Sequence, residues 1–305
     1  MRITHHTLVD NVIYNVNKRM AEIEKRQNEL STGIRVDKPS TDPVAAGEMI
    51  QLQSRIDRVN QYKRNIESGL SQMRSGESAM QEISDLMRQA RSLALQGANG
   101  TLSAGDRSAL AAQVEGLLGS LLEIANRDQG NHYLFGGTET SETPYEAVLD
   151  ANGYITGVTK NFSTEESEIE LIFSEDKRST VSVGATEVFE LSSGGSIFDS
   201  LLNLKSALEN NDPDAVGSSL DSIDEALKQT NDMAAMLGVR VSAANSLMDR
   251  LDTREVDLSS RLATIADVDL VEAITRLDEE QNMYELGLRT SAKVIQPSLV
   301  NFVYL

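Results

Sequence analysis

The side chains best able to do chemistry in this sequence are three histidines, which lie in two places. His5 and His6 form an adjacent pair that could bind a metal ion, and His132, beside Tyr133, could act as a general base. A metal site needs further ligands at suitable spacing, and a general base needs a reacting group beside it. The neighbouring sequence suggests neither, and around His132 it is typical of a strand before a turn, so we expect all three histidines to be structural.

Two other motifs resemble ligand sites only in part. Gly136-Gly137-Thr138 has the glycines of a phosphate-binding loop but lacks its lysine and its spacing, so we expect a tight turn there. An acidic cluster could suggest calcium binding, but it alternates with Ile169 and Leu171, which favours the exposed face of a strand. This cluster consists of Glu165, Glu166, Glu168 and Glu170.

The composition excludes several classes of function. The sequence has no cysteine, so it can form no disulfide, no thiolate metal site and no cysteine nucleophile. No acid, base, nucleophile or metal cluster with credible spacing is found elsewhere. We therefore expect no catalytic site, no metal, no cofactor and no enzymatic activity.

Size and charge limit the partners. A chain of 305 residues with 40% hydrophobic and 25% charged residues can bury a core and hold two or three domains. The whole net charge of −19 lies after residue 130, which does not suit binding to nucleic acid. We find no apolar run of membrane-spanning length and no cleavable signal in residues 1–6, so we expect no membrane partner.

Both ends of the sequence carry the apolar spacing of a helix that packs along a partner helix. The N-terminal series is Val9, Ile13, Val16, Met20, Ile23, Gln27, Leu30 and Ile34. The C-terminal series is Leu270, Ile274, Leu277, Gln281, Tyr284, Leu288, Ser291 and Ile295, and we add Leu299 and Phe302 beyond it.

These two series predict assembly seams. Burying about six apolar residues contributes roughly 10 to 20 kcal/mol, which is less than the cost of ordering about thirty residues. A lone terminal helix should therefore fray until a partner covers it. The alternative is an ordinary amphipathic helix packed on the core of its own chain.

Between the seams, turn signals divide the chain into further elements. The first helix should end at Ser31-Thr32-Gly33, and a second should run from the cap at Asp42-Pro43 to residue 97. A third should begin at the capping pair Ser103 and Asp106 and continue to about residue 130. Strand-like alternation follows, and helical periodicity resumes after residue 195, with a turn at 210–213 and a break at 266–269.

The predicted fold is therefore mainly α: a long antiparallel helical rod with coiled-coil terminal helices and a small inserted β-rich domain. Residues 1–43 and 266–305 form the terminal coiled-coil domain. Residues 44–135 and 197–265 form the rod, and residues 136–196 form the β-rich outer domain.

The turn after the first helix resembles the corresponding motif of the bacterial flagellin superfamily. It comprises Leu30, Ser31, Thr32, Gly33, Arg35, Pro39, Ser40, Asp42 and Pro43. The segments 99–103, 133–137 and 260–299 are similar to the branch of that superfamily that joins hook to filament. The resemblance covers both ends of the chain and excludes residues 140–195.

This resemblance implies a structural axial protein that is secreted through the flagellar type III apparatus and located in the extracellular flagellum after a transient cytoplasmic stage. Its implied partners are copies of itself in a ring, hook-associated protein 1 on the hook side, flagellin on the filament side, and a cytosolic export chaperone on the C-terminal region. Two alternatives remain open: a main filament flagellin, and a cytosolic coiled-coil scaffold that forms stable dimers.

Overall fold

The structure is a computed structural model that describes residues 5–130, 132–137, 143–161, 169–175 and 177–303. The side chains of residues 5, 6, 8, 177 and 293–303 lie outside the described part. The chain divides into two compact units. Unit 1 comprises residues 1–58 and 253–305, and unit 2 comprises residues 59–252.

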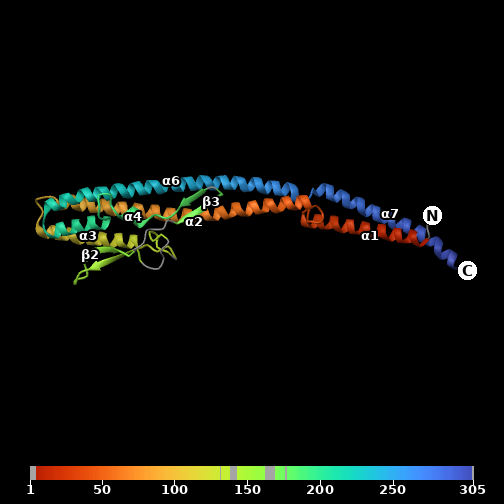
Figure 1. Cartoon of the computed structure of the whole chain (residues 1–305), viewed down its shortest axis with the longest axis horizontal. Coiled ribbons are helices and arrows are strands. Elements are labelled where there is room, and N and C mark those ends of the chain that lie inside the picture. The colour runs from red at the N-terminus through yellow and green to blue at the C-terminus, as the bar shows by residue number, and fades with distance from the viewer. Residues whose placement is uncertain (1–4, 131, 138–142, 162–168, 176, 304–305) are drawn as a thin grey trace. The chain divides into compact units, whose positions relative to one another are not determined.

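Helices make up most of the described chain (Figure 1). They are α1 (His5–Thr32), α2 (Pro43–Gly97), α3 (Ala104–Ala125), α4 (Ala185–Phe189), α5 (Ile197–Glu209), α6 (Pro213–Ala266) and α7 (Leu270–Val303). The strands form two separate antiparallel hairpins, β1 (Tyr145–Leu149) with β2 (Ile155–Lys160), and β3 (Glu170–Ser174) with β4 (Lys177–Thr180). The predicted mainly α fold with a small strand-containing region is confirmed.

Unit 1 contains the antiparallel pair of α1 and α7, which lie side by side with the start of α1 and the end of α7 at one end of the pair (Figure 1). The helix boundaries follow the predicted signals. α1 ends before Gly33, whose φ of 72° favours glycine. α2 begins after Asp42, whose Oδ1 accepts from the Ala45 N–H at 3.0 Å, and Asp269 Oδ1 accepts from the Val271 N–H at 2.9 Å at the start of α7.

Unit 2 is built on an antiparallel pairing of α2 and α6. Arg91 lies 2.6 Å from Asp224, and Lys63 lies 2.6 Å from Asp252. The same number of residues separates the two ion pairs on α2 and on α6, so the register between these helices does not shift from one ion pair to the other. α3 packs on α5, and the predicted capping box at Ser103 and Asp106 is present at the start of α3.

The expectation that no apolar run reaches membrane-spanning length is wrong for α3. In the described part of the chain it is long and apolar enough to cross a membrane by length and composition alone. Its buried residues recur at helical spacing, as in the core helix of a soluble unit, and they include Leu110, Val114, Leu118 and Leu121.

The strand region is anchored by an aromatic cluster. Phe189 lies 5.2 Å from Phe135, 5.1 Å from Tyr145 and 5.3 Å from Phe198, measured between ring centroids. The prediction of a strand around His132 is wrong. Residues 132–137 form a bend and a turn, and their β pairing consists of one isolated bridge. The glycines at positions 136 and 137 permit that turn, so the strand does not extend.

One prediction concerns a glycine in α2. A Cβ atom at Gly69 would lie 2.8 Å from Val181 Cγ1 and 3.1 Å from Phe173 Cζ, so Gly69→Ala should displace these side chains. We expect a loss of about 1 to 3 kcal/mol in the free energy of unfolding, as for other overpacked cores. Urea unfolding measures it. Gly116→Ala in α3 is the matched control, because nothing lies within 4 Å of its Cβ position, and it should stabilise the protein by about 0.4 to 1 kcal/mol.

A second prediction concerns acid stability. The hydrogen bond from Arg127 holds the pKa of Glu82 below its ordinary value of 4.5, and the backbone N–H of Tyr154 holds that of Asp150 below 3.8. A folded-state pKa below the unfolded value contributes stability above the unfolded pKa, and this contribution is lost as pH falls through the folded pKa. The melting temperature should therefore fall below about pH 4.5, the ordinary pKa of Glu82. The fall should be smaller in Glu82→Gln, and equal acid sensitivity of the two proteins would contradict this assignment.

Candidate functional site

The three histidines belong to different units of the chain, and the structure describes the side chain of His132 alone among them. His132 Nε2 is buried without a hydrogen-bond partner in the described part of the chain. His5 and His6 begin α1, but their side chains lie outside the described residues. Within those residues, no group of three or more histidine and carboxylate side chains could hold a metal ion.

The two motifs that partly resemble ligand sites have structural roles at the residues that the structure describes. Gly137 has a φ of 57°, which suits the predicted turn, while Thr138 lies outside the described residues. Glu170 begins β3 on its exposed side and lies 3.8 Å from Arg178. The other members of the acidic cluster, Glu165, Glu166 and Glu168, lie outside the described residues.

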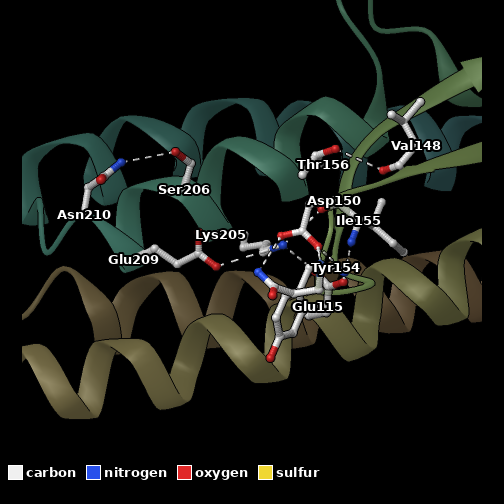
Figure 2. A network of polar contacts seen from close by, with 11 residues as sticks. Glu115, Val148, Asp150, Tyr154, Ile155, Thr156, Lys205, Ser206, Glu209 and Asn210 are labelled. Carbon is white, nitrogen blue, oxygen red and sulfur yellow. Dashed lines mark hydrogen bonds and ion pairs between the residues drawn. The ribbon is translucent and has the colours of Figure 1, made fainter.

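A polar network in unit 2 joins charged groups from several elements, and Figure 2 shows it between two helices and a hairpin. Lys205 on α5 is buried, and its ammonium lies 2.8 Å from Glu115 Oε2 and donates to the Ile155 carbonyl at 3.0 Å. Glu115 on α3 accepts from the Ile155 N–H at 2.7 Å. The Tyr154 ring lies below the ammonium, 5.4 Å from it.

This network is a clamp on the hairpin of β1 and β2. Glu115 accepts a hydrogen bond from the N–H of Ile155, and Lys205 donates one to its C=O. Together they hold the backbone of β2 against α3 and α5. Asp150 closes the hairpin turn by accepting from the Asn152 and Tyr154 N–H groups. Every polar group named here has a structural partner, so the network positions the hairpin and offers no free acid or base.

α1 and α7 pack against each other along one stripe of each helix. A Cβ atom at Gly287 would lie 3.9 Å from Val16 Cγ2, and Arg19 donates to both carboxylate oxygens of Glu280, at 3.0 and 2.8 Å. Helical periodicity extends this packed stripe to other side chains that are at least half-buried. They are Val9, Val12, Ile23 and Leu30 on α1, and Ala273, Leu277, Tyr284 and Ser291 on α7.

A neighbouring stripe of each helix is apolar but open to solvent. Ile13 and Met20 on α1 are 51% and 59% exposed, and Ile274 and Leu288 on α7 are 52% and 44% exposed. Leu270 and two glutamines continue this pattern on the helices, and the exposed Ile34 follows shortly after the end of α1. We call the whole set the open strip: Ile13, Met20, Gln27, Ile34, Leu270, Ile274, Gln281 and Leu288.

The open residues of the two helices lie on one side of the pair. Each of Ile13, Met20, Ile274 and Leu288 directly follows a residue of the packed stripe, so each is rotated by about 100° in the same sense. Because the helices are antiparallel, equal rotations bring both sets to the same side. The contacts of the packed stripe also put Ile13 level with Leu288. The open strip is therefore one surface shared by two helices.

The structure thus divides the predicted seams between two faces. On α7, Leu277 and Tyr284 lie on the packed stripe, whereas Leu270, Ile274 and Leu288 lie on the open strip. The side chains of Ile295, Leu299 and Phe302 lie outside the described residues. That the seam residues mediate assembly stays a prediction.

Sequence reasoning missed several packed residues because they are small or charged. Ala273 is buried on α7, Gly287 lies against Val16, and Glu280 pairs with Arg19. The available signal was the 7-residue spacing of Ala273, Glu280 and Gly287, which matches the spacing of the apolar residues beside them.

The predicted turn motif connects α1 to α2 in the structure. Leu30, Ser31 and Thr32 belong to the last turn of α1, Gly33 closes it, and Asp42 and Pro43 start α2. Arg35 reaches the end of α6, where its guanidinium donates to the Ile265 carbonyl at 3.0 Å. Pro39 and Ser40 lie in the turn closed by the hydrogen bond from Thr41 N to Lys38 O.

Comparison with known proteins connects these helices to one family. Residues 3–140 match the bacterial flagellin N-terminal helical region, and residues 220–303 match the bacterial flagellin C-terminal helical region. Together the two matches cover more than half of the chain, and they include α1, α7 and the turn motif.

Individual relatives are similar to this chain in sequence, and a solved structure is similar to it in fold. The chain is 23% identical to flagellar hook-associated protein 3 of Salmonella typhimurium, over 95% of this chain and 96% of that protein. It is 24% identical to the flagellar filament 33 kDa core protein of Treponema phagedenis, over 90% of this chain and 89% of that one. A putative flagellar hook-associated protein from Vibrio parahaemolyticus has a similar fold, with a TM-score of 0.66 and 20% identity, covering 74% of this chain and 100% of that structure.

Proposed function

Since the chain belongs to the bacterial flagellin family, it is a structural protein of the flagellum, and we propose that it forms the junction between hook and filament. The near full-length similarity to a hook-associated protein 3 supports this position. The two prolines of the turn motif and the Tyr133–Gly137 segment favour it over a main filament flagellin, which the similarity to a filament core protein keeps as the second candidate.

The open strip is the observation that carries the proposed mechanism. α1 and α7 already cover each other along the packed stripe, so the apolar side chains that remain exposed are available to another chain. Burying the exposed halves of six apolar side chains contributes roughly 5 to 9 kcal/mol. Immobilising a partner costs about 4 to 15 kcal/mol, so one contact is marginal. Copies with neighbours on both sides, as in a ring, would be stable.

The partners follow from this position in the flagellum. We infer that copies of the chain form a ring, with hook-associated protein 1 on the hook side and flagellin on the filament side. The terminal helices, residues 1–43 and 266–305, would form the polymer core. Residues 44–135 and 197–265 would form the body of the subunit, and residues 136–196 would face outward. The role is structural and requires no enzymatic activity or cofactor.

We further propose that the chain is exported by the flagellar type III apparatus and held before export by a cytosolic chaperone on residues 270–302. The open strip supports this proposal, because its exposed apolar residues on α7 need protection before assembly. Undiminished chaperone binding by a chain that ends at Asp269 would show that the chaperone binds elsewhere.

Labelling the chain within the flagellum distinguishes the two candidate positions. A short epitope can be inserted in the hairpin turn at Asn152, which is exposed, and detected by immunogold electron microscopy. The junction role predicts label at a single place where hook meets filament. Label along the whole filament would favour a main filament flagellin, and cytoplasmic label alone would favour a coiled-coil scaffold.

A further inference from the structure

Four helix ends meet where α1 passes to α2 and α6 passes to α7, all within unit 1. The two connections are bridged by backbone hydrogen bonds. Arg35 N donates to the Ala266 carbonyl at 2.7 Å, and Val268 N donates to the Gly33 carbonyl at 2.9 Å. We call this region the joint, meaning residues 33–36 and 265–268.

The joint has a small core of its own. Val36, Ala45 and Ala46 are buried, and Met49 and Ile265 pack against them. A cluster of five side chains buries less apolar surface than a domain core does, so it contributes only modestly to holding the connections together. Polar contacts therefore contribute to holding the joint together as well.

Arg35 makes the polar contacts that connect several helix ends. Its guanidinium donates to the Ile265 carbonyl at 3.0 Å and lies 3.7 Å from Asp42 Oδ2. Ile265 is in the last turn of α6, whose carbonyls lack partners within the helix and carry a partial negative charge. Asp42 is the N-terminal cap of α2, and its other oxygen accepts from the Ala45 N–H. One cation thus connects the end of α6 with the start of α2.

We propose that Arg35 is a positioning residue for assembly, which fixes the direction in which the pair of α1 and α7 leaves the ends of α2 and α6. This inference rests on the proposed function. The open strip can meet its neighbours only if the helix pair is held in one direction, because an interface of marginal strength tolerates little loss to orientational freedom. The two backbone hydrogen bonds of the joint alone leave this direction less restricted.

Lysine cannot replace Arg35 in this role. The two contacts lie in different directions, and the planar guanidinium reaches them through separate nitrogens, Nη2 for Ile265 and Nη1 for Asp42. A lysine ammonium is a single point charge on a flexible stem. It preserves the charge but not both contacts.

The test compares Arg35→Ala, Arg35→Lys and the control Lys38→Ala, which removes an exposed cation from the same connection. Hydrogen exchange at the backbone amides of residues 35 and 268 reports opening of the joint. We expect exchange about ten-fold faster in both Arg35 variants, the effect of losing a hydrogen bond to a charged group. The number of filaments per cell should fall strongly in both Arg35 variants, while the melting temperature of unit 2 stays unchanged. Lys38→Ala should change neither the exchange rates nor the number of filaments.

A disulfide across the joint provides the decisive rescue, since the natural chain has no cysteine. Ile34 and Asp267 are bridge partners, and such partners have Cα separations within the range that a disulfide spans. The double substitution Ile34→Cys and Asp267→Cys forms this disulfide when oxidised. Added to Arg35→Ala, it should restore filaments to the number seen in the disulfide-linked chain that keeps native Arg35. Because Ile34 belongs to the open strip, the reference is the same disulfide-linked chain with native Arg35, in which a reduced number of filaments reports the loss of Ile34 alone. Fewer filaments in the disulfide-linked Arg35→Ala chain than in that reference would overturn the positioning role.

Different variants test the role of Arg35 and the proposed function, so the two can be rejected separately. If Ile274→Asp, which changes the open strip, still gives normal filaments, the proposed assembly surface is wrong. If Ile274→Asp abolishes filaments while Arg35→Ala gives normal filaments and unchanged exchange, only the role of Arg35 is wrong.

Discussion

Replacing Ile274 with aspartate is expected to abolish assembly while leaving the isolated chain folded. Ile274 is 52% exposed, so the substitution should lower the free energy of unfolding by no more than about 1.5 kcal/mol, the contribution of the half that is buried. In the assembled state the same carboxylate would be buried against an apolar neighbour, at a cost of several kcal/mol. The measurement is the number of filaments per cell when the variant replaces the native chain.

Two further substitutions on α7 make this experiment specific to the open strip. Val271→Asp adds the same charge at a side chain that is 76% exposed but lies off the strip, so it should leave filaments nearly normal. Leu277→Asp changes the packed stripe and should separate α1 from α7, which circular dichroism would show as lost helix. Equal effects of Ile274→Asp and Val271→Asp on filament number would contradict the assignment of the surface.

Replacing Arg107 with alanine is expected to give the largest loss of stability in unit 2. Arg107 is 3% exposed and donates to the carbonyls of Gly97, Asn99 and Leu102 at 2.8 to 3.1 Å, and to the side chain of Asn211. Its removal leaves several buried acceptors without donors, at a cost of about 3 to 5 kcal/mol. Urea unfolding of the full chain measures this loss.

Two controls separate the role of Arg107 from a general effect of lost charge. Arg107→Lys keeps the charge but cannot reach all these acceptors, so it should recover only part of the stability. Arg91→Ala removes an exposed arginine that pairs with Asp224, and a surface pair is worth about 1 kcal/mol or less. A similar loss for Arg107→Ala and Arg91→Ala would show that the buried contacts of Arg107 contribute little.

Local signals were sufficient to predict where most helices begin and end. Gly33, the Asp42-Pro43 pair and the Ser103-Asp106 capping box each act through contacts within a few residues, so they can be recognised in the sequence. The same locality explains why the turn motif was recognised as a unit.

The assembly surface could be predicted only in part. The 3/4 spacing shows that a helix has a wide apolar band, but it does not show how much of that band the chain's own partner helix covers. On α7 that division depends on Gly287 and Glu280, which meet α1 through contacts across the whole chain. Neither residue is apolar, so the spacing pattern alone excluded them.

The long-range polar contacts could not be predicted at all. Lys205 and Glu115 meet at the backbone of Ile155, and Arg35 meets the end of α6, in each case from distant parts of the sequence. A single charged residue has no periodic signal, and its partner is determined by the packing of the surrounding helices. These residues therefore required the structure.

In its proposed role this chain connects the hook to the filament. The most direct test of this role is electron microscopy of cells that lack the chain, with an assay for flagellin released into the medium. We expect bare hooks together with shed flagellin, because filament subunits would be exported but would find no junction on which to assemble. Normal filaments on such cells would contradict this role.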